Sequence, residues 1–285
     1  MKNPGHTLSS VSLLAGLALW GSVASVARGH GQLHEQIHAI STEIASKPND
    51  ARLYLRRAEL RRLHREEKDA ASDYDAAERL DPAMVEVHLG RGKLLFEFGK
   101  LKEARAALDR LIEVKPDHID ALITRARVEV KRGRSLVAAA DYSKVLELSS
   151  KAEPEHYLEC AKALASAGSE HVPAALDVID RGIAKLGNLP TLILLAMDIE
   201  AGNGDYKAAV ARVDRFLASS TRKEAWLERK GDLLRKAGRP DEAQVTYRAA
   251  LDALNRLSPH VASRKAVIDL KNRLGAKFAA GQPGK

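Results

Sequence analysis

Residues 48–82 read PNDARLYLRRAELRRLHREEKDAASDYDAAERLDP, and the chain returns to this pattern with a period of 34 residues. The residues that share the period are Pro48, Pro82 and Pro116, then Ala70, Ala104 and Ala138, and then Tyr74, Leu108 and Tyr142. After an insertion of three residues the period resumes with Ala175, Ala209 and Ala243. Self-similarity at a fixed period of this length predicts an array of stacked structural repeats.

Each unit is predicted to be a pair of amphipathic helices, because apolar residues such as Leu101, Leu108 and Leu111 recur at helical spacing. A glycine between the two helices can take the left-handed conformation that ends a helix. These glycines are Gly99, Gly133, Gly168, Gly204 and Gly238, and the first unit has Arg65 in their place. Small residues at Ala58, Gly92, Ala126 and Gly231 allow the paired helices to approach closely.

On these residues the chain resembles the tetratricopeptide-repeat family. The matching residues are Tyr54, Ala58, Ala70, Tyr74, Ala77 and Pro82 in the first unit, and Trp226 or Leu227, Gly231, Ala243, Tyr247 and Ala250 in the last. The resemblance covers residues 48–257 and departs from the family pattern at Met197, where a small residue is usual. It implies an all-α, right-handed superhelical solenoid of about six helix-turn-helix repeats, with capping helices at both ends.

The amino-terminal residues predict export. Residues 1–27 hold one charge, Lys2, followed by an apolar core at Val11–Trp20 and then a run of small residues. This order is typical of a secretory signal peptide. We expect a signal peptide over residues 1–29, cut between 27 and 30, and a periplasmic or secreted protein without a stable membrane span after cleavage. An uncleaved membrane anchor is the alternative.

The remaining boundaries follow from the repeat. Ile37, Ile40 and Ile44 share one face of a predicted capping helix over residues 30–47, which precedes the array at 48–257. The other boundaries are a second capping helix at 258–275 and a flexible tail at 276–285.

Composition excludes several classes of protein. The 285 residues include 46 Lys and Arg against 38 Asp and Glu, and only 4% are aromatic. Few aromatic residues argue against a β-sandwich and against the stacking platform that binds single-stranded nucleic acid, so no nucleic-acid partner is expected. The single cysteine, Cys160, excludes an internal disulfide and is expected to be a packing residue.

Histidines near the amino terminus raise two alternatives. His34-Glu35-Gln36-Ile37-His38 matches the H-E-x-x-H motif of zinc proteases. His30, His34 and His38 recur every four residues and could bind a metal from one helix face. A solvated histidine face in a capping helix is the preferred interpretation. Because no phosphate-binding or nucleophile-elbow motif occurs either, we expect a protein that is not an enzyme and uses no cofactor.

The resemblance implies that the first helix of each unit lines an inner groove. The basic residues at groove positions are Arg52, Arg56, Arg62, Lys93, Arg127, Lys131, Arg229 and Arg235. They outnumber the acids at these positions, which include Glu59, Glu86, Asp120, Glu228 and Asp232. A protein or peptide partner, acidic in character, would suit such a groove. The alternative is that these arginines are only solvated, or paired within their own helices.

Overall fold

The computed structural model describes residues 31–280, and every regular element in that range is a helix. The all-α prediction is therefore confirmed. Residues 31–46 are helical. The helices that follow are α2 (Ala51–Leu63), α3 (Glu67–Leu80), α4 (Glu86–Glu97), α5 (Leu101–Val114), α6 (Ile119–Lys131), α7 (Ser135–Leu148), α8 (Pro154–Ala165), η1 (Ser169–His171), α9 (Val172–Leu186), α10 (Pro190–Gly202), α11 (Tyr206–Ser219), α12 (Glu224–Lys236), α13 (Pro240–Asn255), α14 (Pro259–Ala262) and α15 (Lys265–Ala280). The predicted signal peptide lies outside the described residues.

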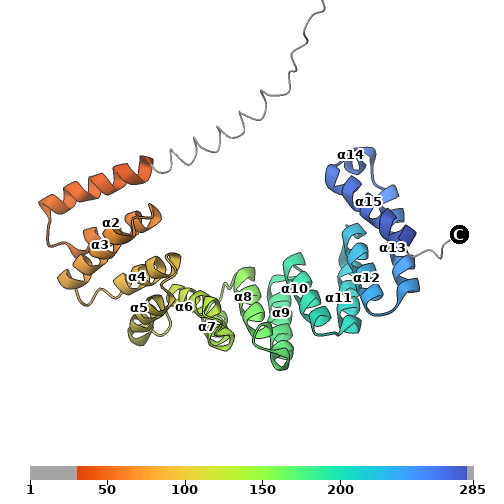
Figure 1. The fold of residues 1–285 in the computed structure, drawn as a ribbon, viewed down its shortest axis with the longest axis horizontal. Helices are drawn as coiled ribbons and strands as arrows, with labels where there is room; N and C mark the ends of the chain where they lie inside the picture. Colours follow the sequence, from red (N-terminus) through yellow and green to blue (C-terminus); the bar gives the residue numbers. More distant parts are fainter. Residues whose placement is uncertain (1–30, 281–285) are drawn as a thin grey trace, which may run out of the picture. The chain divides into compact units, whose positions relative to one another are not determined.

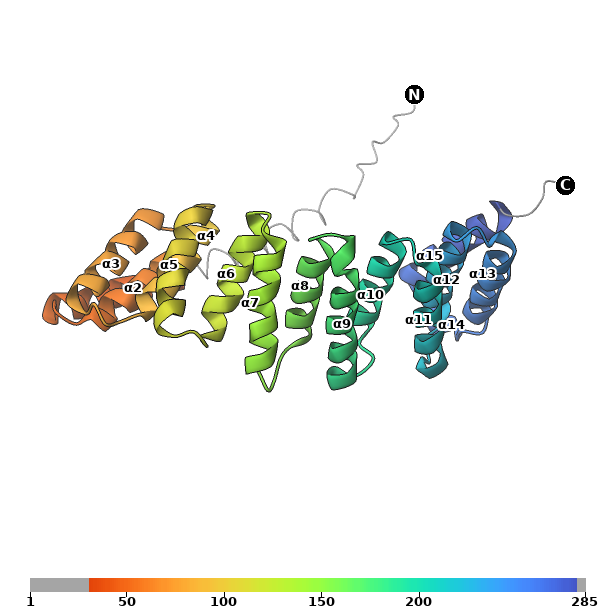
Figure 2. The same ribbon diagram turned by 90° about the horizontal axis from the view of Figure 1, so that it is seen from below.

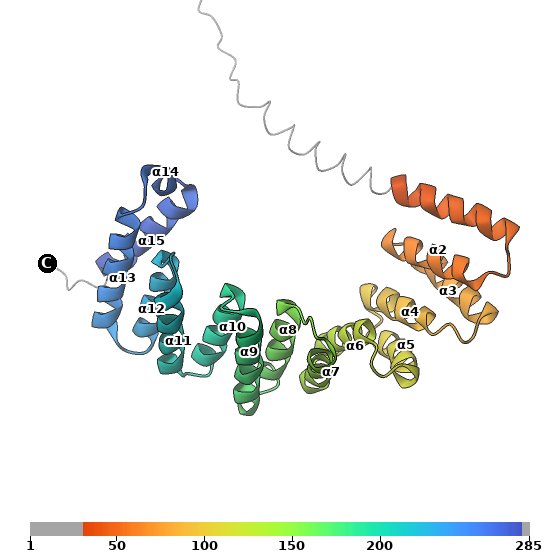
Figure 3. The ribbon, with the colours of Figure 1, turned by 180° about the vertical axis from the view of Figure 1, so that it is seen from behind.

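The helices form two compact bodies, which are described separately. The N-terminal body ends at Arg132 and contains residues 31–46 and helices α2 to α6 (Figure 1). The C-terminal body begins at Gly133 and contains helices α7 to α15 (Figure 2). Within each body, helices that are consecutive in one sequence unit pack as a pair, such as α2 with α3 and α12 with α13. First helices also contact one another, α2 with α4 and α8 with α10, and so form one layer of each body (Figure 3).

Four of the five glycines predicted to end a first helix have φ between +73° and +83°, as the left-handed turn requires. Gly168 differs, with φ +142° and ψ 163°, and it precedes the short helix η1. Gly99 has φ +74° and Gly238 has the same value. In the first unit Arg65 has φ +68°, so it takes the left-handed conformation in spite of its side chain. That conformation costs a residue with a Cβ about 1–2 kcal/mol. The turn geometry is therefore imposed by helix packing and is only favoured by glycine.

The small residues lie where paired helices approach most closely. Ala58 and Ala126 are fully buried. A Cβ added to Gly92 would lie 2.6 Å from Leu108 Cγ on the paired helix. At the equivalent place in the fifth unit, Met197 is also buried, so the fold accepts the departure from the pattern.

The two ends of the described chain are packed against the array. Ile37, Ile40 and Ile44 are buried beside α2, and Arg57 Nη1 donates to Ser41 Oγ over 3.0 Å. At the other end Leu270 and Leu274 of α15 are buried in the same cluster as Tyr247 and Leu254 of α13. Helix α15 continues to Ala280, so the helical segment is longer than the predicted 258–275. It is also preceded by the separate short helix α14.

Candidate partner-binding surface

Helix α2 carries five arginines, and the structure divides them into two groups. Arg57 donates from Nε and Nη2 to both oxygens of Asp73, at 2.8 and 2.7 Å, and Arg61 Nη1 reaches Asp73 Oδ2 at 2.8 Å. Asp73 is buried, so these arginines neutralise a carboxylate inside the body. Arg52 and Arg56 differ, because both are exposed and neither guanidinium group forms a hydrogen bond or ion pair with a described residue.

The third predicted groove residue of α2, Arg62, is engaged by its own protein. It donates to Glu59 Oε2 from Nε and Nη2, at 3.1 and 2.9 Å, and it also pairs with Glu97 at the end of α4. Glu59 in turn accepts from Tyr74 Oη at 2.7 Å, and burial together with this carboxylate raises the pKa of Tyr74. Arg62 therefore stabilises the contact between α2 and α4.

The other predicted basic residues of the N-terminal body come from α4 and α6. Lys93 Nζ lies 4.0 Å from Asp120 Oδ2, so the two residues form a loose ion pair between these helices. Arg127 and Lys131 are exposed on α6. Glu86, an acid at a predicted groove position, accepts a 2.6 Å hydrogen bond from Lys115. The side chains on this layer that can meet a partner are thus fewer than the sequence predicted.

In the C-terminal body, α12 presents Arg229 and Arg235, which are both exposed. Two acids of the same helix, Glu228 and Asp232, are paired with basic residues of α15. Arg273 donates to both oxygens of Glu228, at 3.2 and 3.1 Å, and Lys277 Nζ reaches Glu228 at 2.9 Å and Asp232 at 2.7 Å. Sequence analysis missed this pairing, although Arg273 and Lys277 stand four residues apart on the last helix and so share one face.

A buried ion-pair network in the C-terminal body was also not predicted. Arg212 donates from Nε and Nη2 to Glu200 Oε1, at 2.9 and 2.7 Å, and from Nη1 to Asp180 Oδ1 at 2.6 Å. Burial lowers the pKa of Arg212, but its bonds to the two carboxylates outweigh burial and raise it. The Arg212 side chain also lines a cavity of about 420 Å³ with Ile193 and Phe216. Because Glu200 and Asp180 neutralise the guanidinium group of Arg212, this network joins α9, α10 and α11 and leaves no charge on Arg212 for a partner.

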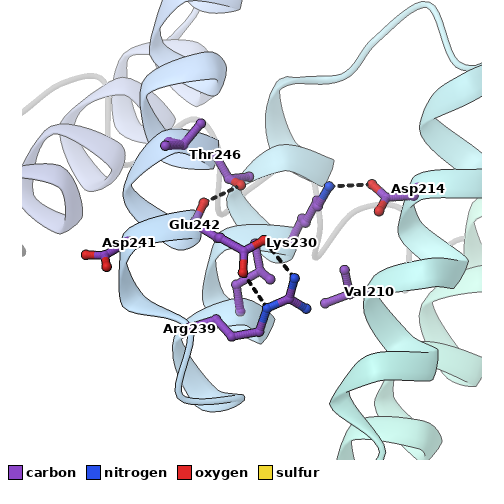
Figure 4. Close-up of a pocket in the computed structure, with 9 residues that line it drawn as sticks. Val210, Asp214, Lys230, Arg239, Asp241, Glu242 and Thr246 are labelled. Atoms are coloured by element: carbon purple, nitrogen blue, oxygen red, sulfur yellow. Dashed lines mark hydrogen bonds and ion pairs between the residues drawn. The ribbon is translucent and has the colours of Figure 1, made fainter.

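A second cavity of about 420 Å³ lies between α11, α12 and α13 (Figure 4). Its apolar lining consists of Val210, Leu234 and Val245. Its charged lining is formed by Lys230, which donates to Asp214 Oδ1 at 2.6 Å, and by Arg239, which donates from Nε and Nη2 to the oxygens of Glu242 at 2.6 and 2.7 Å. The remaining lining residues are Asp241 and Thr246. This cavity is called the outer cleft below.

The histidine motif is placed on the helix at residues 31–46. His34, Glu35 and His38 are exposed, and Ile37 is buried, as a helix that packs against α2 requires. The His34 ring centroid lies 6.4 Å from that of His64. No group of three potential metal ligands occurs among the residues that the structure describes, and His30 lies outside them. The metal-site alternative therefore gains no ligand set from the described part of the chain.

Cys160 is buried in α8, as expected for a packing residue. Its Sγ lies 3.5 Å from Ser143 Oγ on α7, and burial raises the pKa of the thiol. A raised pKa opposes formation of the reactive thiolate.

In the range 31–280, no helix is both long enough and apolar enough to cross a membrane.

Comparisons with known proteins identify the repeat in two parts of the chain. Tetratricopeptide-repeat models match residues 65–128 and 194–260. The human protein DnaJ homolog subfamily C member 3 is 28% identical over 193 residues, which make up 62% of this chain and 38% of that protein. The CTR9 homolog of Arabidopsis thaliana is 30% identical over 97 residues, 33% of this chain and 9% of that protein. The chain thus spans less than half the length of the curated relatives it matches.

Among solved structures, the C-terminal part of a tetratricopeptide-repeat protein from Cytophaga hutchinsonii superimposes with a TM-score of 0.64. The match is 16% identical in sequence and covers 87% of this chain and 98% of that one. At this level of identity the likeness concerns the fold.

Proposed function

Because the chain is a tetratricopeptide-repeat protein, a family whose members bind proteins or peptides, we propose that it is a non-enzymatic scaffold that binds an acidic protein segment. The binding surface is the exposed side of the first helices of the N-terminal body, centred on α2. The partner is held by equilibrium recognition on a preformed surface, without covalent chemistry. We also propose that the protein acts outside the cytoplasm, on the basis of the signal-peptide pattern in residues 1–29.

The contrast among the arginines of α2 carries this proposal. Arg57, Arg61 and Arg62 each have carboxylate partners in the N-terminal body. Arg52 and Arg56 lie one helical turn apart, so their guanidinium groups can reach the same ligand. Neither has a partner among the described residues. Two adjacent unpaired guanidinium groups favour a carboxylate-bearing partner, because a guanidinium binds a carboxylate with two parallel hydrogen bonds.

The test is site-specific photocrosslinking in the native cell envelope. A photoreactive amino acid in place of Leu55 on α2 should form adducts with a protein, whereas the same group in place of Leu80 on α3 should not. Reversing Arg52 and Arg56 to Glu should abolish the adduct. Arg79→Glu with Lys102→Glu, on α3 and α5, is the matched control and should leave it intact.

Salt dependence provides a second readout on the purified partner. Affinity should fall as ionic strength rises, chiefly through slower association, because charge steers the encounter. Adducts that form equally from Leu80, or that survive the reversal of Arg52 and Arg56, would refute the α2 surface as the binding site.

A further inference from the structure

The outer cleft exposes an apolar side chain that folding does not explain. Val245 is 71% exposed in the middle of α13, while Val210 and Leu234, which line the same cavity, are buried. A β-branched residue is a weaker helix former than alanine, so an exposed valine in mid-helix brings the folded state no benefit.

The equivalent positions of the other second helices show what the fold itself requires. The repeat aligns Val245 with small or polar residues, namely Ser72, Ala106, Ala140, Asp177 and Ala211. All five are exposed. The valine is therefore particular to the last unit and is not a demand of helix packing.

The negative charge of Asp241, which lines the outer cleft, is also particular to this unit. Asp241 occupies the position that carries lysine in three other units, at Lys68, Lys102 and Lys207. An acid near a helix amino terminus is favourable by itself, but those three helices form with a lysine there. The stability of the helix therefore does not explain why this unit has aspartate where three other units have lysine.

The two cations of the outer cleft are already neutralised. Lys230 is paired with Asp214 and Arg239 with Glu242, and Figure 4 shows Asp241 directed away from both pairs. The Asp241 carboxylate makes no hydrogen bond or ion pair with any residue in 31–280. The lining consequently has three carboxylates against two cations, and it favours a positively charged ligand although the whole chain carries a formal charge of +8.

We propose that the outer cleft is a second docking site, which binds a partner segment that places a Leu, Ile or Val side chain next to a Lys or Arg. The apolar side chain covers Val245 and reaches Val210 and Leu234. The cation lies beside Asp241. The cavity volume of about 420 Å³ suits such a short segment, since ligand pockets span about 300–1,000 Å³. This site would recognise a chemistry opposite to that of the α2 surface.

The probes are fluorescein-labelled nonapeptide pools with leucine fixed at the centre. One set of pools carries arginine at one of the four following positions, and the matched set carries glutamate there. Fluorescence polarisation with the full-length protein should detect binding of at least one arginine pool. The matched glutamate pool should bind at least tenfold more weakly.

Three variants separate the site from general stability. Val245→Ala should weaken binding severalfold while the melting temperature stays equal or rises, because alanine is the better helix former. Asp241→Lys should weaken binding up to about fivefold, the range of one exposed ion pair. Ala106→Asp is the control, because Ala106 of α5 occupies the repeat position of Val245. This variant should leave peptide affinity unchanged.

Reversal of Arg52 and Arg56 should also leave peptide binding unchanged, which keeps this test independent of the α2 surface. The proposal is overturned if no arginine pool binds. It is equally overturned if glutamate pools bind as well as arginine pools, or if Val245→Ala and Asp241→Lys bind like the wild type.

Discussion

Arg91 on α4 donates to Asp75 Oδ1 on α3 over 2.8 Å, and the two residues stand sixteen positions apart. The same separation joins Arg125 to Asp109 at 2.8 Å and Lys230 to Asp214 at 2.6 Å. In each case the acid lies on the second helix of one unit and the base on the first helix of the next. A polar contact between neighbouring units therefore recurs in register with the repeat.

The recurrence has two informative variations. The helix at residues 31–46 takes part through Ser41, which accepts from Arg57 at the same separation of sixteen. This helix thus packs as the second helix of a unit would. Ser143 on α7 and Cys160 on α8 stand seventeen positions apart and bring two neutral side chains together, with 3.5 Å between Oγ and Sγ. The polar contact between neighbouring units is thus an ion pair in three places and involves neutral side chains where these units meet.

The first prediction compares the buried ion pair of Arg212 and Glu200 with the more exposed pair of Lys230 and Asp214. Arg212→Met should destabilise the protein by about 3–5 kcal/mol, because it leaves Glu200 buried without a partner. Lys230→Met should cost about 1 kcal/mol or less, since Asp214 keeps access to water. Urea denaturation of each variant measures the difference.

The double variant Arg212→Met with Glu200→Leu checks the cause. It should recover much of the loss, because replacing a buried pair by apolar residues removes the unpaired charge. If the double variant is as unstable as Arg212→Met, the buried carboxylate is not the source of the effect.

The second prediction concerns backbone conformation. Gly99→Ala should lower the free energy of unfolding by about 1 kcal/mol, because alanine is strained at φ +74° although no atom lies within 4 Å of its Cβ. Gly275→Ala, inside α15 and equally unobstructed, should raise it by about 0.5–1 kcal/mol. Thermal unfolding of the pair should thus show shifts of opposite sign, and shifts of the same sign would contradict the left-handed turn.

The third prediction is a pH dependence of the last helix. Burial raises the pKa of Glu228, but hydrogen bonds from Arg273 and Lys277 outweigh burial and hold the pKa below its ordinary value. A carboxylate with a depressed pKa stabilises the fold above its unfolded-state pKa and loses that effect as the pH falls through its folded-state pKa. Stability should therefore fall on acidification below about pH 4.3, the ordinary pKa of a glutamate.

Glu228→Gln isolates this contribution. It should lower stability at pH 7 and flatten the loss at acidic pH, with hydrogen exchange rising first in α15. Glu242→Gln removes a carboxylate from a solvent-exposed pair and serves as the control, with little effect at either pH. Equal acid sensitivity in the wild type and Glu228→Gln would argue against the role of this carboxylate.

The fourth prediction concerns Cys160. Because the thiol is buried and its pKa is raised by that burial, a maleimide at pH 7 should modify it only after unfolding. Cys160→Ser should cost about 1 kcal/mol or more, through a buried hydroxyl in place of a weakly polar thiol. Rapid labelling of the native protein would show that α8 opens locally.

The amino-acid sequence by itself determined the period, the helix pairs and the turns between them. These features depend on preferences that act within one unit: helical spacing of apolar residues, small residues where two helices touch, and glycine or proline at helix ends. Even Arg65, which breaks the glycine pattern, adopts the positive φ of this turn, because α2 and α3 on either side of it pack against each other as a pair.

Only the tertiary structure decided which charged residues remain available for a partner. Arg56 and Arg62 look alike in the sequence of α2, yet Arg62 is paired with Glu97, 35 residues away on the next first helix. Glu228 and Asp232 were expected to face a groove, and Arg273 and Lys277, 45 positions further along, cover them. Short-range patterns specify a helix and its apolar face, whereas the neutralisation of a charge depends on the side chains that another helix brings within about 3 Å of it.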